Sequence, residues 1–382
     1  MSNMRTVFVS TGSQIWGTNY RVLGLARNLY KLGLDVHVLL PDLPENREWF
    51  PEGHYEGVPI HLTKPGALSE PRSKFQMLRT LRPSVVHCAG VIKPCFPAAA
   101  AYRANHNCEL IVDFDEHLSR IKMHGAARRL YYLFAENVAR RYADRIVVAS
   151  RFLERWFCEP HRQPVLYLPN AADLDLFRQQ QSGWQELRAR WGGRKVVTYF
   201  GALSPHYDAD MVFDAAVMML RRRRDLVFVF VGGGELLGTL RARAQQIGLE
   251  DSIQFCGFVP DELVPKYLSA ADALVFPIRD NWWNRARCPG KVYQFMAAMV
   301  PIVTNPVGEV WEALGNRAWY FKDRDVDDFV HVLENSLATG KDNRCPDELL
   351  ARQHSWHSQA ESYLAFLDSG LGEKLHSARI AV

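Results

Sequence analysis

A polar and aromatic loop that leads into an apolar helix carries the residues best suited to chemistry in this chain. The segment reads FPIRDNWWNRARCPGKVYQF and begins at Phe276. Pro289 stands where a first helical residue is expected, and Lys291 follows in the first turn. Arg285 and Arg287 come just before the helix. Because a helix amino end and nearby cations both attract anions, the segment is suited to hold a diphosphate; an ordinary charged surface loop is the alternative.

A run of three glycines is the second candidate for anion binding. The strand expected at Val227–Val231 leads into Gly232, Gly233 and Gly234, and Glu235 is expected to open the next helix. Consecutive glycines let backbone N–H groups approach a ligand closely, although a structural tight turn has the same composition. The run lacks the G-x-G-x-x-G spacing of dinucleotide enzymes, so an NAD-dependent oxidoreductase is disfavoured.

Ionisable side chains gather after another apolar strand, expected at Leu110–Phe114. Asp113 lies within this strand, and Asp115, Glu116 and His117 follow it. Ligands of parallel sheets bind outside the carboxyl ends of the strands. These residues are therefore a candidate site for an acceptor, that is, for a molecule to which a group is transferred. His117 or Asp115 is suited to bind or orient an acceptor hydroxyl. The alternative is that they cap the next helix and form ion pairs.

The loop after the first strand, TGSQIWGTNY, contains Gly12 and Gly17. It opens the first helix, where Thr18 or Asn19 is suited to be the N-cap. Such a loop can approach a donor phosphate or an acceptor, and a plain strand-to-helix turn is the alternative. His87 ends a neighbouring strand and is expected to be a core histidine.

These segments belong to an alternation of short apolar strands and amphipathic helices along the whole chain. Runs such as VVH and IVVA are nearly all apolar, as expected for parallel strands covered on both faces. The alternation pauses at the polar stretch Arg178–Arg194 and then restarts. The pattern predicts an α/β protein with two doubly wound, Rossmann-like domains facing across a cleft, at 1–178 and 195–355. A C-terminal helix at about 356–382 is expected to pack back on the first domain.

The overall composition excludes several classes of protein. The chain has 382 residues, 48% of them hydrophobic, and a net charge of +4, which gives no sign of nucleic-acid binding. No apolar run approaches the roughly 18 residues that span a bilayer, and no secretion signal is recognisable. Seven scattered cysteines without a C-x-x-C pair predict a reducing cytoplasm and no structural zinc or disulfide framework.

A basic stretch lies between Ser119 and Tyr142. It has six lysines and arginines against one acidic residue, Glu136, with leucines and aromatics between them. One interpretation is a solvated helix face. The other is that the helix at 120–142 contacts anionic lipid headgroups, which would make the protein peripheral at the inner face of the membrane.

Motifs along nearly the whole chain resemble the retaining GT-B glycosyltransferases of family 4. The text NAADLDLF at Asn170–Phe177 is similar to the segment that leads into the C-terminal domain of the family, and CPGKVYQFMAAMVPIV is similar to its donor helix. Phe200–Leu203 and Val231–Gly234 resemble its two glycine loops, and Val307–Glu309 resembles the turn after the donor helix. The resemblance implies that the nucleotide-sugar donor is lined by Gly201, Gly232, Gly233, Gly234, Glu235, Arg287, Pro289, Gly290, Gln294, Gly308 and Glu309.

The chain departs from the pattern of this family at four positions. The usual Glu-x7-Glu pair falls on Ala286 and Gln294, and the usual arginine and lysine of the first glycine loop fall on Ala202 and Tyr207. Gln294 can still hydrogen-bond ribose hydroxyls, but without the help of a charge. The resemblance therefore implies a variant site, in which the cations around the donor helix supply the missing positive charge.

The sequence predicts a hexosyltransferase-like enzyme that moves a sugar from a nucleotide-sugar to an acceptor hydroxyl. Retention, and a reaction without metal or other cofactor, are expected, with Lys291 and Arg285 stabilising the departing diphosphate and His117 serving the acceptor. The acceptor is a glycan, a lipid-linked molecule or a small molecule, such as a natural product. A sugar-nucleotide epimerase and a degenerate binding or scaffold subunit are the alternatives.

Overall fold

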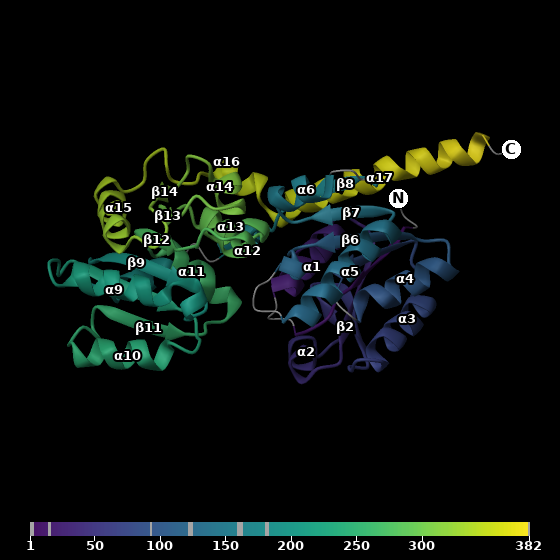
Figure 1. The fold of residues 1–382 in the computed structure, drawn as a ribbon. Helices are drawn as coiled ribbons and strands as arrows, with labels where there is room; N and C mark the ends of the chain where they lie inside the picture. The colour runs from purple at the N-terminus through teal and green to yellow at the C-terminus, as the bar shows by residue number, and fades with distance from the viewer. Residues whose placement is uncertain are drawn as a thin grey trace. The chain divides into compact units, whose positions relative to one another are not determined.

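The computed structural model describes residues 4–13, 17–91, 94–120, 125–158, 163–179 and 183–380. The chain forms two compact units (Figure 1). The first contains Met1–Ala171, Ala286–Cys288 and Trp356–Val382, and the second contains Ala172–Arg285 and Pro289–Ser355. Each unit has a mainly parallel sheet with helices around it, so the predicted α/β class is confirmed.

The first unit is built on an eight-stranded sheet with the order β3-β4-β2-β1-β5-β6-β7-β8. All its strand pairs are parallel except β3 with β4. Carboxyl ends of the parallel strands therefore meet at one edge. The strands are β1 (Arg5–Val9), β2 (Asp35–Pro41), β3 (His54–Tyr55), β4 (Val58–Thr63), β5 (Val85–Ala89), β6 (Glu109–Phe114), β7 (Arg145–Val148) and β8 (Val165–Tyr167).

Two apolar clusters cover the two faces of this sheet. Alternate side chains of β1 show the division, because Val7 and Val9 join one cluster and Phe8 joins the other. The first cluster includes side chains of α3, α4, α5 and α6, and the second includes side chains of α1 and α17. The helical segments are α1 (Gly17–Lys31), α2 (Pro44–Trp49), α3 (Ser69–Leu81), α4 (Cys95–Asn105), η1 (Leu118–Arg120), α5 (Ala126–Tyr142), α6 (Arg151–Cys158) and α17 (Trp356–Ile380).

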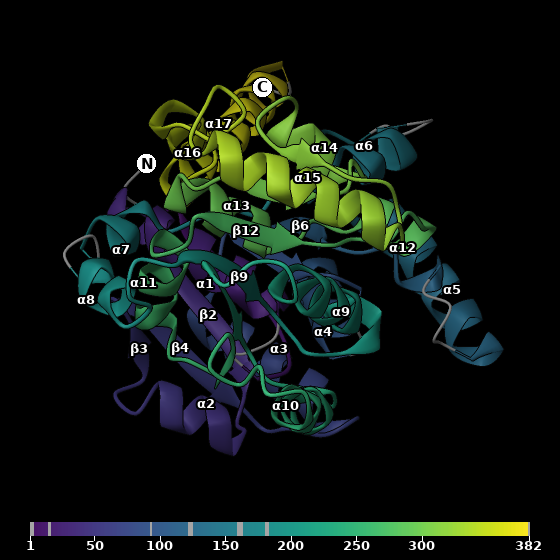
Figure 2. The ribbon, with the colours of Figure 1, turned by 90° about the vertical axis from the view of Figure 1, so that its left-hand side faces the viewer.

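The second unit has a six-stranded sheet with the order β11-β10-β9-β12-β13-β14, and every pair in it is parallel. The helices α9 and α15 lie side by side on one face (Figure 2), where Phe213 and Phe329 are fully buried. The strands are β9 (Lys195–Phe200), β10 (Leu226–Val231), β11 (Ile253–Gly257), β12 (Ala273–Phe276), β13 (Ile302–Thr304) and β14 (Trp319–Tyr320). The helical segments are α7 (Leu174–Gln179), α8 (Trp184–Ala189), η2 (Pro205–Tyr207), α9 (Ala209–Leu220), α10 (Leu237–Gln246), η3 (Asp261–Leu263), α11 (Val264–Ser269), α12 (Trp282–Ala286), α13 (Gly290–Ala298), α14 (Glu309–Leu314), α15 (Val326–Thr339) and α16 (Glu348–Gln353).

Candidate functional site

Two loops at the carboxyl edge of the second sheet are in direct backbone contact. The N–H of Gly201, after β9, donates to the carbonyl of Val231 (2.9 Å), and the N–H of Leu203 donates to that of Gly233 (2.8 Å). A Cβ at Gly232 would overlap the carbonyl oxygen of Gly201, and the φ of Gly232 is 137°. Only glycine fits there, so the two glycine loops form one continuous backbone surface.

The glycine run does not itself open a helix. Helix α10 begins at Leu237, two residues later than the predicted start at Glu235. The side chain of Glu235 instead lies beside the loop after β9, where it accepts a hydrogen bond from the Ser204 hydroxyl (3.3 Å). Gly234 is fixed by a close approach, since a Cβ there would lie 2.5 Å from the Leu203 carbonyl oxygen.

Lys291 lies in the first turn of α13 and reaches the loop after β9. Its ammonium nitrogen is 5.7 Å from the ring centre of Phe200 and 5.2 Å from that of Tyr207. A Cβ added to Gly201 would overlap this nitrogen. Pro289 is the N-cap of α13, with Gly290 as the first helical residue, one residue later than predicted. The structure therefore brings together Lys291 and the first glycine loop.

The two arginines that precede α13 differ in their surroundings. Arg285 forms a two-pronged ion pair with Asp280 (2.5 and 2.7 Å), and this hydrogen bonding raises the pKa of the guanidinium. Arg287 belongs to the first unit, together with Ala286 and Cys288. Within the second unit, Lys291 lies against the first glycine loop.

The backbone carbonyl groups of the short segment 286–288 accept hydrogen bonds from other residues of the first unit. Ala286 is buried in the core of that unit, and its carbonyl accepts a hydrogen bond from the Ser150 hydroxyl (2.6 Å). The Cys288 carbonyl accepts one from the Asn170 amide (2.6 Å). Position 286, where the family has a glutamate, is therefore an apolar core position in this chain.

Two residues that the resemblance places in the lining of the donor, Gly308 and Glu309, lie at the start of α14. Gly308 has a φ of 52°, and a Cβ there would lie 2.7 Å from the Arg285 carbonyl oxygen. Glu309 is buried and opens α14, where the helix dipole favours a carboxylate. The Tyr293 hydroxyl donates to Glu309 (3.3 Å), and Gln294 is half-buried in the same helix, α13.

An ion pair that the sequence did not reveal joins two loops of this edge. Arg279, after β12, donates through Nε to both carboxylate oxygens of Asp208 (2.8 and 2.9 Å) and through Nη2 to the Pro205 carbonyl (2.8 Å). Asp208 is buried and has a left-handed φ of 51°. No sequence spacing indicates this pair, because only the adjacency of β9 and β12 brings the two loops together.

A buried charge network lies at the carboxyl edge of the first sheet. Arg21 of α1 forms a two-pronged ion pair with Asp113 (2.7 and 3.0 Å), and His87 lies 3.3 Å from the same carboxylate. The other ring nitrogen of His87 is 2.9 Å from the Tyr363 hydroxyl. Burial alone would raise the pKa of Asp113, but the charge of Arg21 and the hydrogen bond with His87 hold it below its ordinary value. These residues join α1, β5, β6 and α17.

Asp115 lies beside the amino end of α1. The Thr18 hydroxyl donates to its carboxylate (2.6 Å), and Gly17 is the first residue of this helix. Burial and the charge of Asp113 raise the pKa of Asp115. Glu116 follows and is half-buried. The structure therefore brings together the predicted acceptor-side residues Gly17 and Asp115.

His117 is buried beside Glu136 of α5. It is 3% exposed, its Nε2 lies 3.6 Å from Glu136, and its ring centre lies 5.0 Å from that of Trp156. Burial, with the charges of Arg120 and Arg140, lowers the pKa of His117 to about 4. The imidazole is therefore neutral near pH 7.

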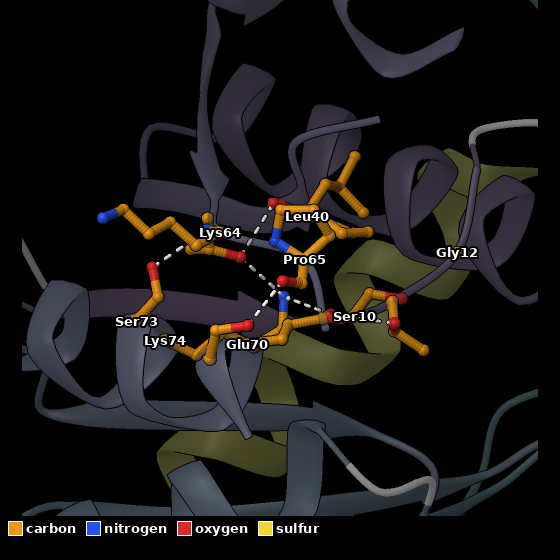
Figure 3. A network of polar contacts seen from close by, with 12 residues as sticks. Ser10, Gly12, Leu40, Lys64, Pro65, Glu70, Ser73 and Lys74 are labelled. Atoms are coloured by element: carbon orange, nitrogen blue, oxygen red, sulfur yellow. Dashed lines mark hydrogen bonds and ion pairs between the residues drawn. The ribbon is translucent and has the colours of Figure 1, made fainter. Parts of the chain in front are cut away.

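The loop after β1 is held by a polar network that the sequence also did not reveal (Figure 3). The Thr11 hydroxyl donates to Glu70 (2.9 Å), which forms an ion pair with Lys74 (3.2 Å). Lys74 is fully buried and donates to the Thr63 hydroxyl (3.1 Å). Asn19 donates to the carbonyl of Thr11 (2.9 Å). The described part of this loop is thereby tied to α1, α3 and β4.

The first half of α5 exposes apolar side chains next to arginines. Leu130 and Phe134 are 67% and 68% exposed, and Arg128 and Arg129 are exposed beside them. Figure 2 shows the amino end of α5 projecting from the first unit. Residues 121–124 of the predicted basic helix lie outside the described residues. No helix in the described part of the chain is both long and apolar enough to cross a membrane.

Two doubly wound units of this kind define the GT-B fold, and solved structures of that fold match nearly the whole chain. The complex of Anabaena Alr3699/HepE with UDP and glucose has a TM-score of 0.75 at 17% identity, covering 96% of this chain and 100% of that chain. Sucrose-phosphate synthase from Thermosynechococcus elongatus has a TM-score of 0.72 at 15% identity, covering 98% and 100%. Residues 17–171 match the family model "Glycosyl transferase 4-like domain", and residues 194–339 match "Glycosyl transferases group 1". The chain belongs to the family 4-like glycosyltransferases.

Curated relatives match parts of the chain. A GDP-mannose-dependent alpha-(1-6)-phosphatidylinositol monomannoside mannosyltransferase of Mycobacterium tuberculosis is 35% identical over 115 residues, which are 30% of each protein. The protein of the same name in Mycolicibacterium smegmatis is 29% identical over 204 residues, 51% of this chain and 53% of that relative. The chain thus spans between 30% and 53% of the length of these relatives.

Proposed function

We propose that this protein transfers a sugar from a nucleotide-sugar donor to an acceptor hydroxyl, with retention and without a metal. The observation that carries the proposal is the position of the Lys291 ammonium, at the amino end of α13 and against Gly201 of the paired glycine loops. A cation, a helix amino end and glycine N–H groups together stabilise the charge of a departing diphosphate. The name of the mycobacterial relatives, GDP-mannose-dependent mannosyltransferases, supports a nucleotide-sugar donor.

The proposed chemistry needs no nucleophilic side chain. The acceptor hydroxyl attacks the sugar on the face from which the diphosphate leaves, and the leaving phosphate takes the hydroxyl proton. The neutral imidazole of His117 and the carboxylate of Asp115 are the candidates to orient the acceptor, because both lie after β6 in the first unit. Arg285 and Arg287 remain candidates to add positive charge at the donor.

A glycan or lipid-linked acceptor agrees with the name of the mycobacterial relatives, which act on a phosphatidylinositol monomannoside. The exposed leucine and phenylalanine of α5, flanked by arginines, have the composition of a helix that lies in a lipid interface. We therefore propose that the protein works in the cytoplasm, with α5 in peripheral contact with the inner face of the membrane.

The test of the donor site compares two lysine variants. UDP-, GDP-, dTDP- and ADP-sugars are first screened for an increase in the melting temperature, which any ligand that binds only the folded state must cause. Lys291→Ala should abolish this stabilisation, or turnover, for the best donor. Lys341→Ala, an exposed lysine after α15, should behave as the wild type.

Three results would contradict the proposal. Donor binding and transfer that persist in Lys291→Ala would exclude the proposed role of the ammonium. An epimerised sugar and free nucleotide, formed without an acceptor, would instead indicate an epimerase. Failure of the wild type to bind any nucleotide-sugar would indicate a degenerate binding or scaffold subunit.

A further inference from the structure

The Lys291 ammonium lies over two aromatic rings, one at the end of β9 and one in η2. The rings of Phe200 and Tyr207 both face it, with centres 5.7 and 5.2 Å from the nitrogen. An aromatic face attracts a cation without cancelling its charge. Such a position confines a flexible lysine side chain at the first glycine loop.

Tyr207 is itself held in place by its neighbours in the chain. The N–H of Tyr207 donates to the Ser204 carbonyl (3.0 Å), and the Tyr199 hydroxyl donates to the Tyr207 carbonyl (3.3 Å). The next residue, Asp208, is buried and ion-paired to Arg279, which also donates to the carbonyl of Pro205. Arg279 therefore ties both ends of the turn that carries Tyr207 to the loop after β12.

The backbone of Asp208 supports a specific role for its carboxylate. Its φ of 51° is a conformation that glycine adopts freely and that aspartate adopts only at a cost in free energy. An aspartate at such a position is explained by what its side chain contacts. Here both carboxylate oxygens accept a hydrogen bond from the Nε–H of Arg279.

We propose that the Asp208–Arg279 pair holds the ring of Tyr207 against Lys291, and that Tyr207 and Asp208 are positioning residues for donor binding. The lysine is thereby placed at the glycine loops before the diphosphate arrives, so less conformational entropy is lost on binding. Tyr207 stands where the family has a lysine, and it thus serves donor binding by orienting Lys291. This inference rests on the proposed function, because it names the device that positions Lys291.

The test measures diphosphate binding in variants of Tyr207. The ligand is the one of UDP, GDP, dTDP and ADP that raises the melting temperature of the wild type most. Calorimetry then measures the affinity for this diphosphate and for the matching nucleoside. Tyr207→Leu removes the ring and should weaken diphosphate binding about tenfold while nucleoside binding is unchanged. Tyr207→Phe keeps the ring and should bind both as the wild type does. A variant that merely misfolds would lose both ligands.

Two substitutions of Asp208 separate its carboxylate from its backbone. Asparagine tolerates the same φ and glycine prefers it, but neither forms the ion pair with Arg279. Asp208→Asn and Asp208→Gly should both weaken diphosphate binding about three- to tenfold, again without an effect on the nucleoside. If the residue serves only the turn, Asp208→Gly will bind as the wild type does.

The outcomes separate this inference from the proposed function. Wild-type affinity in Tyr207→Leu and Asp208→Asn, with binding lost in Lys291→Ala, would overturn the positioning role alone. Absence of binding of all four diphosphates to the wild type would overturn both. Weakened diphosphate binding in Tyr207→Leu, with Tyr207→Phe unchanged, supports the positioning role.

Discussion

Individual ionisable residues of the first unit have pKa values that are shifted from their ordinary ones. His117 is the clearest example, because burial and the charges of Arg120 and Arg140 lower its pKa from 6.5 to about 4. Its carboxylate neighbour, Glu136, is also buried and accepts a hydrogen bond from the N–H of Ser119 (3.1 Å), and burial raises the pKa of Glu136. The two shifts act in opposite directions on acidification, because the folded chain takes up a proton later than the unfolded chain at His117 and earlier at Glu136.

Stability should fall on acidification because of His117. Between pH 6.5 and about 4 the unfolded chain binds a proton at this residue that the folded chain does not, so the free energy of unfolding decreases as pH falls. The full shift corresponds to roughly 3 kcal/mol at pH 4. Urea unfolding across this range should show a smaller pH dependence in His117→Gln than in the wild type. Identical slopes in the two proteins would contradict the lowered pKa.

The candidate residues differ in how far the sequence could predict their surroundings. The position of Lys291 in the first turn of a helix follows from the proline and the apolar pattern around it. The Asp208–Arg279 pair could not be predicted, because its partners are 71 residues apart and meet only through the order of β9 and β12. The surroundings of Glu70 and Lys74 could not be predicted either, because the residues that contact them, Thr11 and Thr63, lie in other segments of the chain.

At the scale of elements, strands with a continuous apolar run lie where the sequence predicts them. Val85–Ala89 and Leu226–Val231 are buried throughout and lie where the sequence indicates them. Strand β4 was missed because Pro59 and His61 interrupt its apolar pattern. It tolerates the proline because it lies near the edge of the sheet, beside the two-residue strand β3. The short helices α8 and α12 were missed inside segments rich in polar residues.

The paired glycine loops give a prediction with a matched control. A Cβ at Gly232 would overlap the Gly201 carbonyl at a φ of 137°, whereas a Cβ at Gly233 has nothing within 4 Å. Gly232→Ala should therefore lower the free energy of unfolding by about 3 kcal/mol and abolish donor stabilisation, because the two loops must separate. Gly233→Ala should leave the free energy of unfolding nearly unchanged. Thermal unfolding with and without a nucleotide-sugar measures the effects of Gly232→Ala, and equal melting temperatures of the two variants without a ligand would refute the contact.

The exposed side of α5 gives a prediction about lipid binding. Cosedimentation with phosphatidylglycerol vesicles should fall about tenfold when Leu130 and Phe134 are both replaced by glutamate, because apolar contact is lost and negative charge is added. Leu349→Glu is the control, since Leu349 is equally exposed (67%) in the second unit. Neutral phosphatidylcholine vesicles should bind the wild type more weakly. Unchanged cosedimentation of the double variant would exclude α5 as the lipid contact.

At the scale of the whole molecule, the two units are not continuous stretches of chain. The first unit is completed by residues from the end of the sequence, because Trp356, Ala360 and Tyr363 of α17 belong to its core. A Cβ at Gly24 of α1 would overlap the Trp356 ring, so α1 and α17 pack closely at this point. The stability of the first unit therefore depends on residues that follow the second.

This dependence should separate the two units in calorimetry. Trp356 is 2% exposed, so Trp356→Ala should leave a cavity that costs about 3–5 kcal/mol and lower the melting temperature of the first unit by roughly 10 °C. A nucleotide-sugar should still raise the melting temperature of the second unit in this variant, because its proposed contacts lie there. Trp311→Ala removes a 45% exposed tryptophan of the second unit and should change neither transition by more than a few degrees. If Trp356→Ala lowered both transitions equally, the two units would unfold as one, and α17 would support the whole molecule instead of the first unit alone.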